Sequence, residues 1–159
     1  MYLGEKRKEE QVKKEPEVED ETIKSSYKIN DITVEQNLSI VKSSTTGLYD
    51  TAQIKYKLTN NSDQSKNIGL RVMLDTMLGE NDGAPLRMGE EAITTDKIFS
   101  QNELSNFYQA FDSISEPKVT SQGTLKGQGV TVPDNVYFSD WGSLADGSWD
   151  FDFNSGEEF

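Results

Sequence analysis

Oxygen-bearing side chains gather in residues 75–83 (DTMLGENDG), where Asp75, Asn81 and Asp82 could act together on a hard cation. Calcium takes about six to eight oxygen ligands, and carboxylate and amide groups of one loop can supply several of them. Calcium is therefore the candidate cofactor, and these three residues are its candidate ligands. The spacing matches no established calcium loop, and Asp82-Gly83 is a common turn dipeptide, so a plain hairpin turn is the favoured interpretation.

A second acidic stretch places Asp150, Asp152 and Asn154 at every second position. It resembles the opening of an EF-hand loop, but its glycine falls at position 7 instead of 6, and the twelfth position lies beyond Phe159. Residues 149–153 (WDFDF) alternate aromatic and acidic side chains, which is typical of a strand. A strand without a metal ion is the favoured interpretation.

Aromatic side chains suggest a different chemistry, the stacking of sugar rings. Trp141, Tyr108 and Tyr137 are the candidate ligand-binding residues. Trp141 stands between Asp140 and Gly142 at the end of a predicted strand, which makes it the best surface candidate. Because large aromatic side chains usually fill the core, packing is the favoured role for the set as a whole.

Several classes of function are excluded or disfavoured by composition. The chain contains neither cysteine nor histidine, which excludes disulfides, zinc and iron–sulfur sites built on those residues, and catalysis by either side chain. A net charge of −12 argues against nucleic acid as a partner, because phosphate contacts need a surplus of Lys and Arg. Carboxylate pairs are too easily found among 28 acidic residues to indicate a glycosidase. We predict that the protein is not an enzyme, and a glycosidase-type domain is the least favoured alternative.

The elements that would position these residues are mainly strands. Alternation of apolar and polar side chains predicts strands at 32–41 and 51–59, and residues 67–78 (NIGLRVMLDTML) have the pattern of a central strand covered on both faces. Shorter strands are predicted at 118–126, 130–132, 136–141 and 149–153. The fold class predicted from this pattern is all-β, an antiparallel β-sandwich.

One segment has a helical pattern instead. Ser100 and Glu103 have the spacing of a capping box, and apolar side chains follow at helical intervals up to Phe111. We predict one short helix near residues 101–111, with Tyr108 on it.

The N-terminal stretch differs from the rest of the chain. Residues 1–24 hold six basic and eight acidic residues and few apolar ones, so we predict a charged, disordered tail or linker there. Residues 25–159 are then predicted to form one β-sandwich domain, and an ending so close to a strand pattern suggests truncation at its C-terminal end. The sequence has no signal-peptide pattern and no transmembrane segment.

Three stretches resemble a known but uncharacterised group of proteins. Residues 68–85 (IGLRVMLDTMLGENDGAP), 108–114 (YQAFDSI) and 136–153 (VYFSDWGSLADGSWDFDF) are similar to a β-sandwich module of bacterial secreted and cell-surface proteins. The resemblance implies an extracellular or cell-envelope location, with neighbouring modules of a longer chain or envelope components as partners. It assigns no catalytic residue.

The expected function is therefore that of a non-catalytic structural or adhesion-type module of a bacterial envelope or secreted protein. The alternative is a carbohydrate-binding module, stabilised by calcium, in which Trp141 acts with Tyr108 or Tyr137 on a glycan. Exposed aromatic rings on one surface would favour the alternative, and a fully packed sandwich would favour the structural module.

Overall fold

A computed structural model describes residues 14–140, 142 and 153 of the chain. The chain divides into two compact units, which are described separately. Of the described residues, we call those up to Leu70 the N-terminal unit and those from Arg71 onward the C-terminal unit. Within the described part of the chain, no helix has the length and apolar character needed to cross a membrane.

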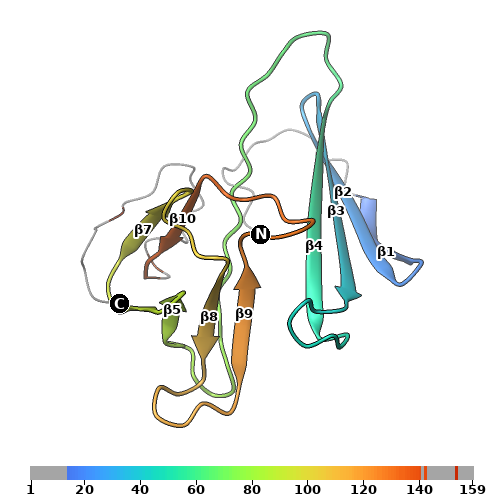
Figure 1. The fold of residues 1–159 in the computed structure, drawn as a ribbon. Coiled ribbons are helices and arrows are strands. Elements are labelled where there is room, and N and C mark those ends of the chain that lie inside the picture. The colour runs from blue at the N-terminus through green and yellow to red at the C-terminus, as the bar shows by residue number, and fades with distance from the viewer. Residues whose placement is uncertain (1–13, 141, 143–152, 154–159) are drawn as a thin grey trace. The chain divides into compact units, whose positions relative to one another are not determined.

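The N-terminal unit contains one four-stranded antiparallel sheet, in which each strand pairs with the next along the chain (Figure 1). Its strands are β1 (Lys14–Glu19), β2 (Thr22–Ile29), β3 (Ile32–Val41) and β4 (Thr51–Asn60). The β1–β2 hairpin turns through Asp20 and Glu21, which have φ values of 50° and 58°. Two residues with positive φ match the right-handed twist of the strands that they join, so the connection needs only two residues.

Alternation gives this sheet one apolar and one polar face. Successive side chains of a strand point to opposite faces, so the paired residues Tyr27, Val34 and Leu58 share the apolar face. The neighbours Lys28, Thr33 and Thr59 share the polar face. The strands predicted at 32–41 and 51–59 are confirmed as β3 and β4.

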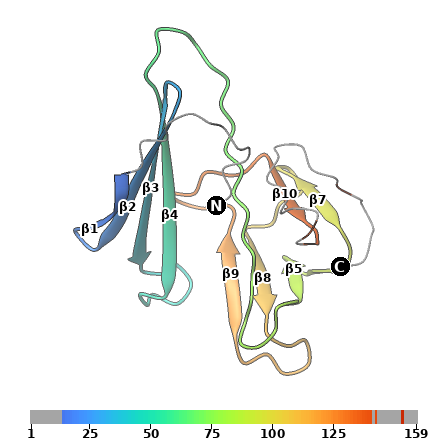
Figure 2. The same cartoon turned by 180° about the vertical axis from the view of Figure 1, so that it is seen from behind.

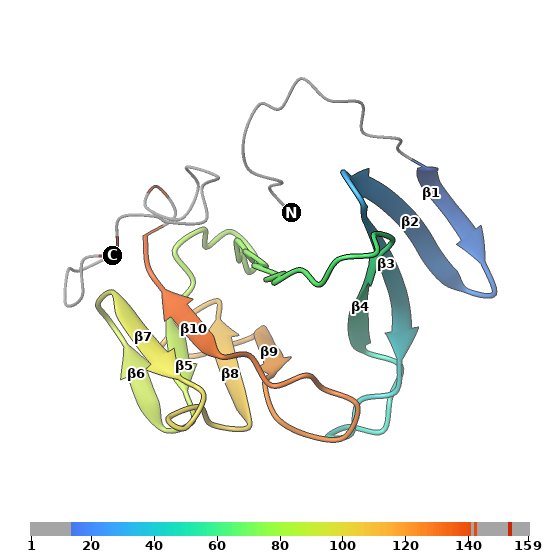
Figure 3. The ribbon, with the colours of Figure 1, turned by 90° about the horizontal axis from the view of Figure 1, so that it is seen from above.

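The C-terminal unit contains a four-stranded sheet of order β6-β5-β8-β9 and a two-stranded ribbon of β7 and β10, all antiparallel (Figure 2, and Figure 3 for β6). The sheet is built from β5 (Leu86–Met88), β6 (Glu91–Ile93), β8 (Phe107–Phe111) and β9 (Thr120–Thr124). The ribbon consists of β7 (Lys97–Ser100) and β10 (Asn135–Phe138), and Figure 3 shows it beside the strands of the sheet.

The core of the C-terminal unit joins the sheet to the ribbon. Its buried side chains come from both and from the loops between them: Met88, Ile93, Phe99, Leu104, Leu125 and Phe138. The Phe99 and Phe138 rings meet edge to face with centroids 5.9 Å apart, an arrangement that aromatic pairs favour. The all-β, antiparallel prediction is confirmed, and within this unit two layers of strands pack over one core in the manner of a small sandwich.

The structure differs from the predicted division of the chain at two places. Residues 14–24, expected in the disordered tail, form β1 and the beginning of β2. Cross-strand pairing explains the difference, because Val18 and Ile23 face each other across the hairpin and Lys24 forms an ion pair with Glu19. The stretch from residue 25 onward was also predicted as one domain, whereas the chain divides between Leu70 and Arg71.

The predicted helix near residues 101–111 is also wrong. The capping-box contacts do form, since Glu103 Oε2 accepts hydrogen bonds from the Ser100 backbone N–H at 2.9 Å and from its hydroxyl at 2.5 Å. They close a turn at 100–103, and the chain then enters β8. Pairing of β8 with β5 and β9 satisfies the backbone that a helix would have satisfied internally.

The central strand predicted at 67–78 is absent from the three sheets of the described residues. In Figure 1 the trace between β4 and β5 carries no arrow, and Ile68, Leu70, Val72 and Leu74 are exposed. Alternation of apolar and polar side chains indicates which face of a strand would be buried. It does not show whether a neighbouring strand is available for backbone pairing.

The shorter strand predictions have mixed outcomes. The predictions at 118–126 and 136–141 overlap β9 and β10, whereas residues 130–132 form no strand. Val132 packs against the core from a loop instead. The strand predicted at 149–153 lies outside the described residues, except for Phe153.

Candidate functional site

Asn81, a predicted calcium ligand, holds two turns of the C-terminal unit together. Its Oδ1 accepts the Gly83 N–H at 3.0 Å, and its Nδ2 donates to the backbone carbonyl of Asp112 at 3.0 Å. The backbones of Leu78 and Asn81 exchange two hydrogen bonds of 3.0 Å, and Gly79 between them has a φ of 63°. The chain therefore reverses at 78–81, slightly before the turn predicted at Asp82-Gly83.

The other two predicted metal ligands, Asp75 and Asp82, lie exposed on either side of this turn. Within residues 14–140, 142 and 153, no three acidic side chains are grouped so that they could hold one ion. Calcium binding by Asp75, Asn81 and Asp82 stays an untested alternative to the plain turn, and thermal unfolding with calcium and with EDTA tests it.

Asp112 is a structural carboxylate that sequence reasoning missed. It follows β8, and its Oδ1 accepts the backbone N–H groups of Lys118 at 2.9 Å and Val119 at 3.1 Å. These hydrogen bonds stabilise the charged form, so they hold the pKa of Asp112 below its ordinary value, with the Val119 bond as the main cause. An Asp followed by Ser after a strand is a usable signal for such a turn.

Tyr108, a predicted sugar-stacking residue, is partly buried and packs against the core. Its ring meets the Phe138 ring edge to face with centroids 5.8 Å apart, and it lies against Gly123 on the neighbouring strand β9. Burial raises the pKa of the Tyr108 hydroxyl. These contacts support a packing role, and a sugar contact of Tyr108 stays a prediction.

Tyr137 is placed differently, on the outer side of the β7–β10 ribbon. Phe138 points into the core, so its neighbour Tyr137 points away from it and remains 38% exposed, opposite Ile98 on β7. The Phe153 ring meets the Tyr137 ring edge to face, with centroids 5.4 Å apart. Trp141, the third predicted residue, lies outside the described part of the chain.

A buried carboxylate fastens the ends of the same ribbon. Asp96 is 4% exposed and directly precedes β7. It accepts the Ser139 hydroxyl at 2.6 Å and the Asp140 backbone N–H at 3.2 Å, both just after β10. Its hydrogen bonds close the ribbon where the two strands meet, which is a structural role.

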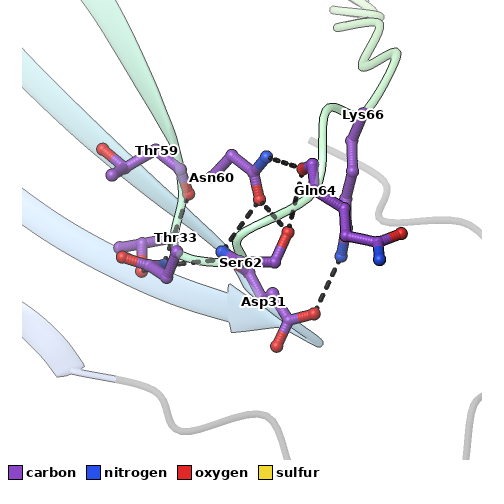
Figure 4. A network of polar contacts seen from close by, with 8 residues as sticks. Asp31, Thr33, Thr59, Asn60, Ser62, Gln64 and Lys66 are labelled. Carbon is purple, nitrogen blue, oxygen red and sulfur yellow. Dashed lines mark hydrogen bonds and ion pairs between the residues drawn. The ribbon is translucent and has the colours of Figure 1, made fainter.

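A network of polar contacts closes one end of the N-terminal sheet (Figure 4). Lys66 Nζ donates to the Asp31 carboxylate at 2.8 Å, and this hydrogen bond is the main reason why the pKa of Asp31 lies below its ordinary value. Asn61 Nδ2 donates to the Asp31 carbonyl and the Thr33 hydroxyl, both at 2.9 Å. Together these contacts attach the segment after β4 to the β2–β3 turn.

An apolar row crosses the whole N-terminal sheet on its apolar face. Val18 pairs with Ile23, Ile23 with Leu38, and Leu38 with Ile54. Val18 is 77% exposed, and Ile23 and Ile54 are each 43% exposed, so much of this apolar row is in contact with solvent. Large side chains placed this way in adjacent strands form a continuous apolar strip.

A polar ladder runs beside the apolar row on the same face. Ser25 pairs with Gln36 and Gln36 with Tyr56. The Ser25 hydroxyl donates to Gln36 Oε1 at 3.4 Å, and Gln36 Nε2 donates to the Tyr56 hydroxyl at 2.6 Å. In the sequence these residues stand at positions that alternation assigns to the apolar face, so a polar side chain at such a position is the signal that indicates the ladder.

Comparison of the sequence with protein-family models, and of the chain with curated proteins and solved structures, found no match.

Proposed function

We propose that this chain is a non-catalytic structural or adhesion-type module of a bacterial envelope or secreted protein, and that it contacts a neighbouring β-module through the apolar row. The observation that supports this proposal is the register itself. It aligns Val18, Ile23, Leu38 and Ile54 across four strands and leaves most of them accessible.

The chemistry of this face fits another sheet. A sheet usually covers its apolar face with a second layer, and two stacked sheets interlock side chains about 10 Å apart. The apolar row offers regularly spaced aliphatic side chains, which a second apolar sheet face can match. Exposed apolar strips of this kind commonly mark protein contacts.

The polar residues discussed above support a structural role. Asn81, Asp112, Asp96 and Glu103 all accept hydrogen bonds from backbone N–H groups of turns or strand ends. Side chains that accept backbone hydrogen bonds in this way hold loops and strand ends in one conformation. A structural module needs such fixed loops to keep its contact surfaces in place.

The accessibility of the apolar row can be tested with Nile red, a neutral dye that the net charge of −12 does not repel. We expect the native protein to enhance Nile red fluorescence, and Ile54→Thr to reduce that enhancement while keeping a β-branched side chain in the strand. Lys55→Thr alters the adjacent position on the polar face and should leave it unchanged. Equal dye binding by both variants would contradict the proposal.

The alternative function, carbohydrate binding, is supported by Tyr137 and its contact with Phe153. We expect any glycan contact to depend on Tyr137 and not on the partly buried Tyr108, whose ring packs against Phe138. Calorimetric titration with a panel of soluble oligosaccharides would test this, with Tyr137→Ala as the variant. Heat of binding that Tyr137→Ala abolishes would favour this alternative over the structural module.

A further inference from the structure

Residues 67–77 have the sequence of a strand but belong to none of the three sheets of the described residues. The even-numbered positions from Ile68 to Leu74 are between 43% and 60% exposed, and Met77 is 60% exposed. Its aliphatic side chains are thus accessible, and it forms no ladder with a described strand. An apolar segment with the sequence of a strand that lies outside a sheet can pair with another chain.

The two charges of the segment indicate which strand would pair with it. Arg71 and Asp75 are the only charged residues between positions 67 and 78, and they stand four positions apart. In an antiparallel pair of identical strands centred on Met73, Arg71 of each copy lies opposite Asp75 of the other. Opposite charges placed across from each other stabilise a strand pair, whereas like charges destabilise it.

The same register also matches the apolar side chains. Val72 lies opposite Leu74 of the second copy, and Leu70 lies opposite Thr76. All these even-numbered side chains share one face of the paired ribbon, because opposite residues point to the same side. Registers centred on Arg71 or Asp75 would instead place like charges together, and those centred on Val72 or Leu74 would pair neither charge with another. The charges therefore favour the register centred on Met73.

We propose that two copies of this chain associate by antiparallel pairing of residues 69–77, with the two-fold axis at Met73. Such an interface is isologous, since the same surface is used by both copies. A single strand pair is a small interface, so we expect a weak dimer that dissociates on dilution. This contact is separate from that proposed for the apolar row.

Sedimentation equilibrium of the full chain, from about 1 μM to about 1 mM, tests the association directly, a range that covers weak complexes. We expect a dimer at the upper end. Arg71→Asp and Asp75→Arg each place like charges opposite each other twice, so each should weaken the dimer about tenfold or more. A wild-type chain that remains monomeric throughout would overturn the proposal.

Mixing the two variants provides the sharpest outcome. In a mixed pair, the two acidic side chains of the Arg71→Asp chain face the two basic side chains of the Asp75→Arg chain. The mixture should therefore form a heterodimer although each variant alone is largely monomeric, and the heterodimer also shows that both variants are folded. If either variant alone dimerises as strongly as the wild type, or if the mixture fails to associate while both variants keep the wild-type circular dichroism spectrum, the register is wrong.

A cross-link can establish the position of the axis, because the chain has no native cysteine. Directly opposite residues in antiparallel strands have Cα atoms about 4.5–5.5 Å apart, which suits a disulfide. Met73→Cys should therefore form a covalent dimer rapidly under mild oxidation. Met77→Cys is the matched control, because its two copies would lie about 27 Å apart. Equal rates for both variants, or a Met73→Cys chain that stays monomeric, would overturn the proposed register.

Discussion

At the scale of single residues, the contact between Gly123 and Tyr108 determines how β8 and β9 can approach. A Cβ atom added at Gly123 would overlap the Cε1 and Cζ atoms of the Tyr108 ring. The ring is itself held against Phe138, so it cannot move aside without loss of core packing. The glycine is thus required by the space that the ring occupies.

We expect Gly123→Ala to destabilise the C-terminal unit by about 1–3 kcal/mol, the usual cost of overpacking a core. Urea unfolding followed by tryptophan fluorescence measures this, since both tryptophans of the chain come after residue 140 in the sequence and none lies in residues 1–140. Gly83→Ala is the control, because the nearest atom to its added Cβ is 3.8 Å away. Equal losses in the two variants would refute the steric explanation.

The lowered pKa of Asp112 gives a pH dependence of definite sign. A carboxyl whose pKa is lower in the folded state than its ordinary value of 3.8 stabilises the fold above about pH 4, and this contribution is lost as pH falls through the folded pKa. We expect Asp112→Asn to be less stable than wild type at pH 7, and the difference to shrink toward about pH 2. Urea midpoints across this range measure it.

Asp63→Asn is the matched control for Asp112→Asn, because it changes the net charge equally at an exposed position in the loop after β4. At pH 7, the urea midpoint of Asp63→Asn should differ from that of the wild type much less than the midpoint of Asp112→Asn does. A loss of stability in Asp112→Asn, relative to the wild type, that grows as the pH is lowered would contradict the role assigned to the Asp112 carboxylate.

At the scale of elements, the polar ladder is expected to fix the register of β2, β3 and β4. A slip of one residue would move Gln36 to the polar face and break both of its hydrogen bonds. We expect Gln36→Ala to lower the stability of the N-terminal sheet by about 1–3 kcal/mol, because it leaves partly buried polar groups without their partner. Hydrogen exchange of the β3 amides measures the effect. Asn37→Ala, on the polar face, should change exchange little.

The strands could be predicted where alternation coincides with pairing, as in β3 and β4. The same signal failed at residues 67–78, where the pattern is equally regular but no described strand pairs with it. At 100–111 the local contacts of Ser100 and Glu103 formed as predicted, yet β5 and β9 determined the conformation of what followed. The local sequence pattern favours a helix or a strand, and pairing with distant strands decides which of them forms.

The candidate site was less predictable than the strands for the same reason. Residue type identified Asn81 and Tyr108 as side chains able to bind a ligand. Only the fold shows that Asn81 forms hydrogen bonds with Asp112 and Gly83, and that the Tyr108 ring packs against Gly123 and Phe138. Tyr137 kept part of its exposure because it alternates with a core residue. In a strand with neighbouring aromatic residues, the ring that faces outward is the one on the side away from the layer that packs against the strand. The sequence does not show on which side that layer lies.

At the scale of the whole molecule, calcium and EDTA provide the broadest test of the ligand hypotheses. A ligand that binds only the folded chain raises the unfolding midpoint by several degrees when it is present at about a hundredfold excess over its Kd. We expect no such rise, because both polar ends of the Asn81 side chain are engaged by protein groups. A rise that Asp82→Asn abolishes would instead establish the predicted calcium site.

The contact of Tyr108 with Gly123 also has a consequence for internal motion. A tyrosine ring that packs between neighbours exchanges its two edges by rotating half a turn about its long axis, and these neighbours must withdraw to let it pass. Here one edge lies on the backbone of β9 and the ring meets Phe138, so rotation requires the two strands to part briefly. The flip rate of this one ring therefore reports how often the C-terminal sheet opens, and the two edges should give separate proton resonances when that opening is slow.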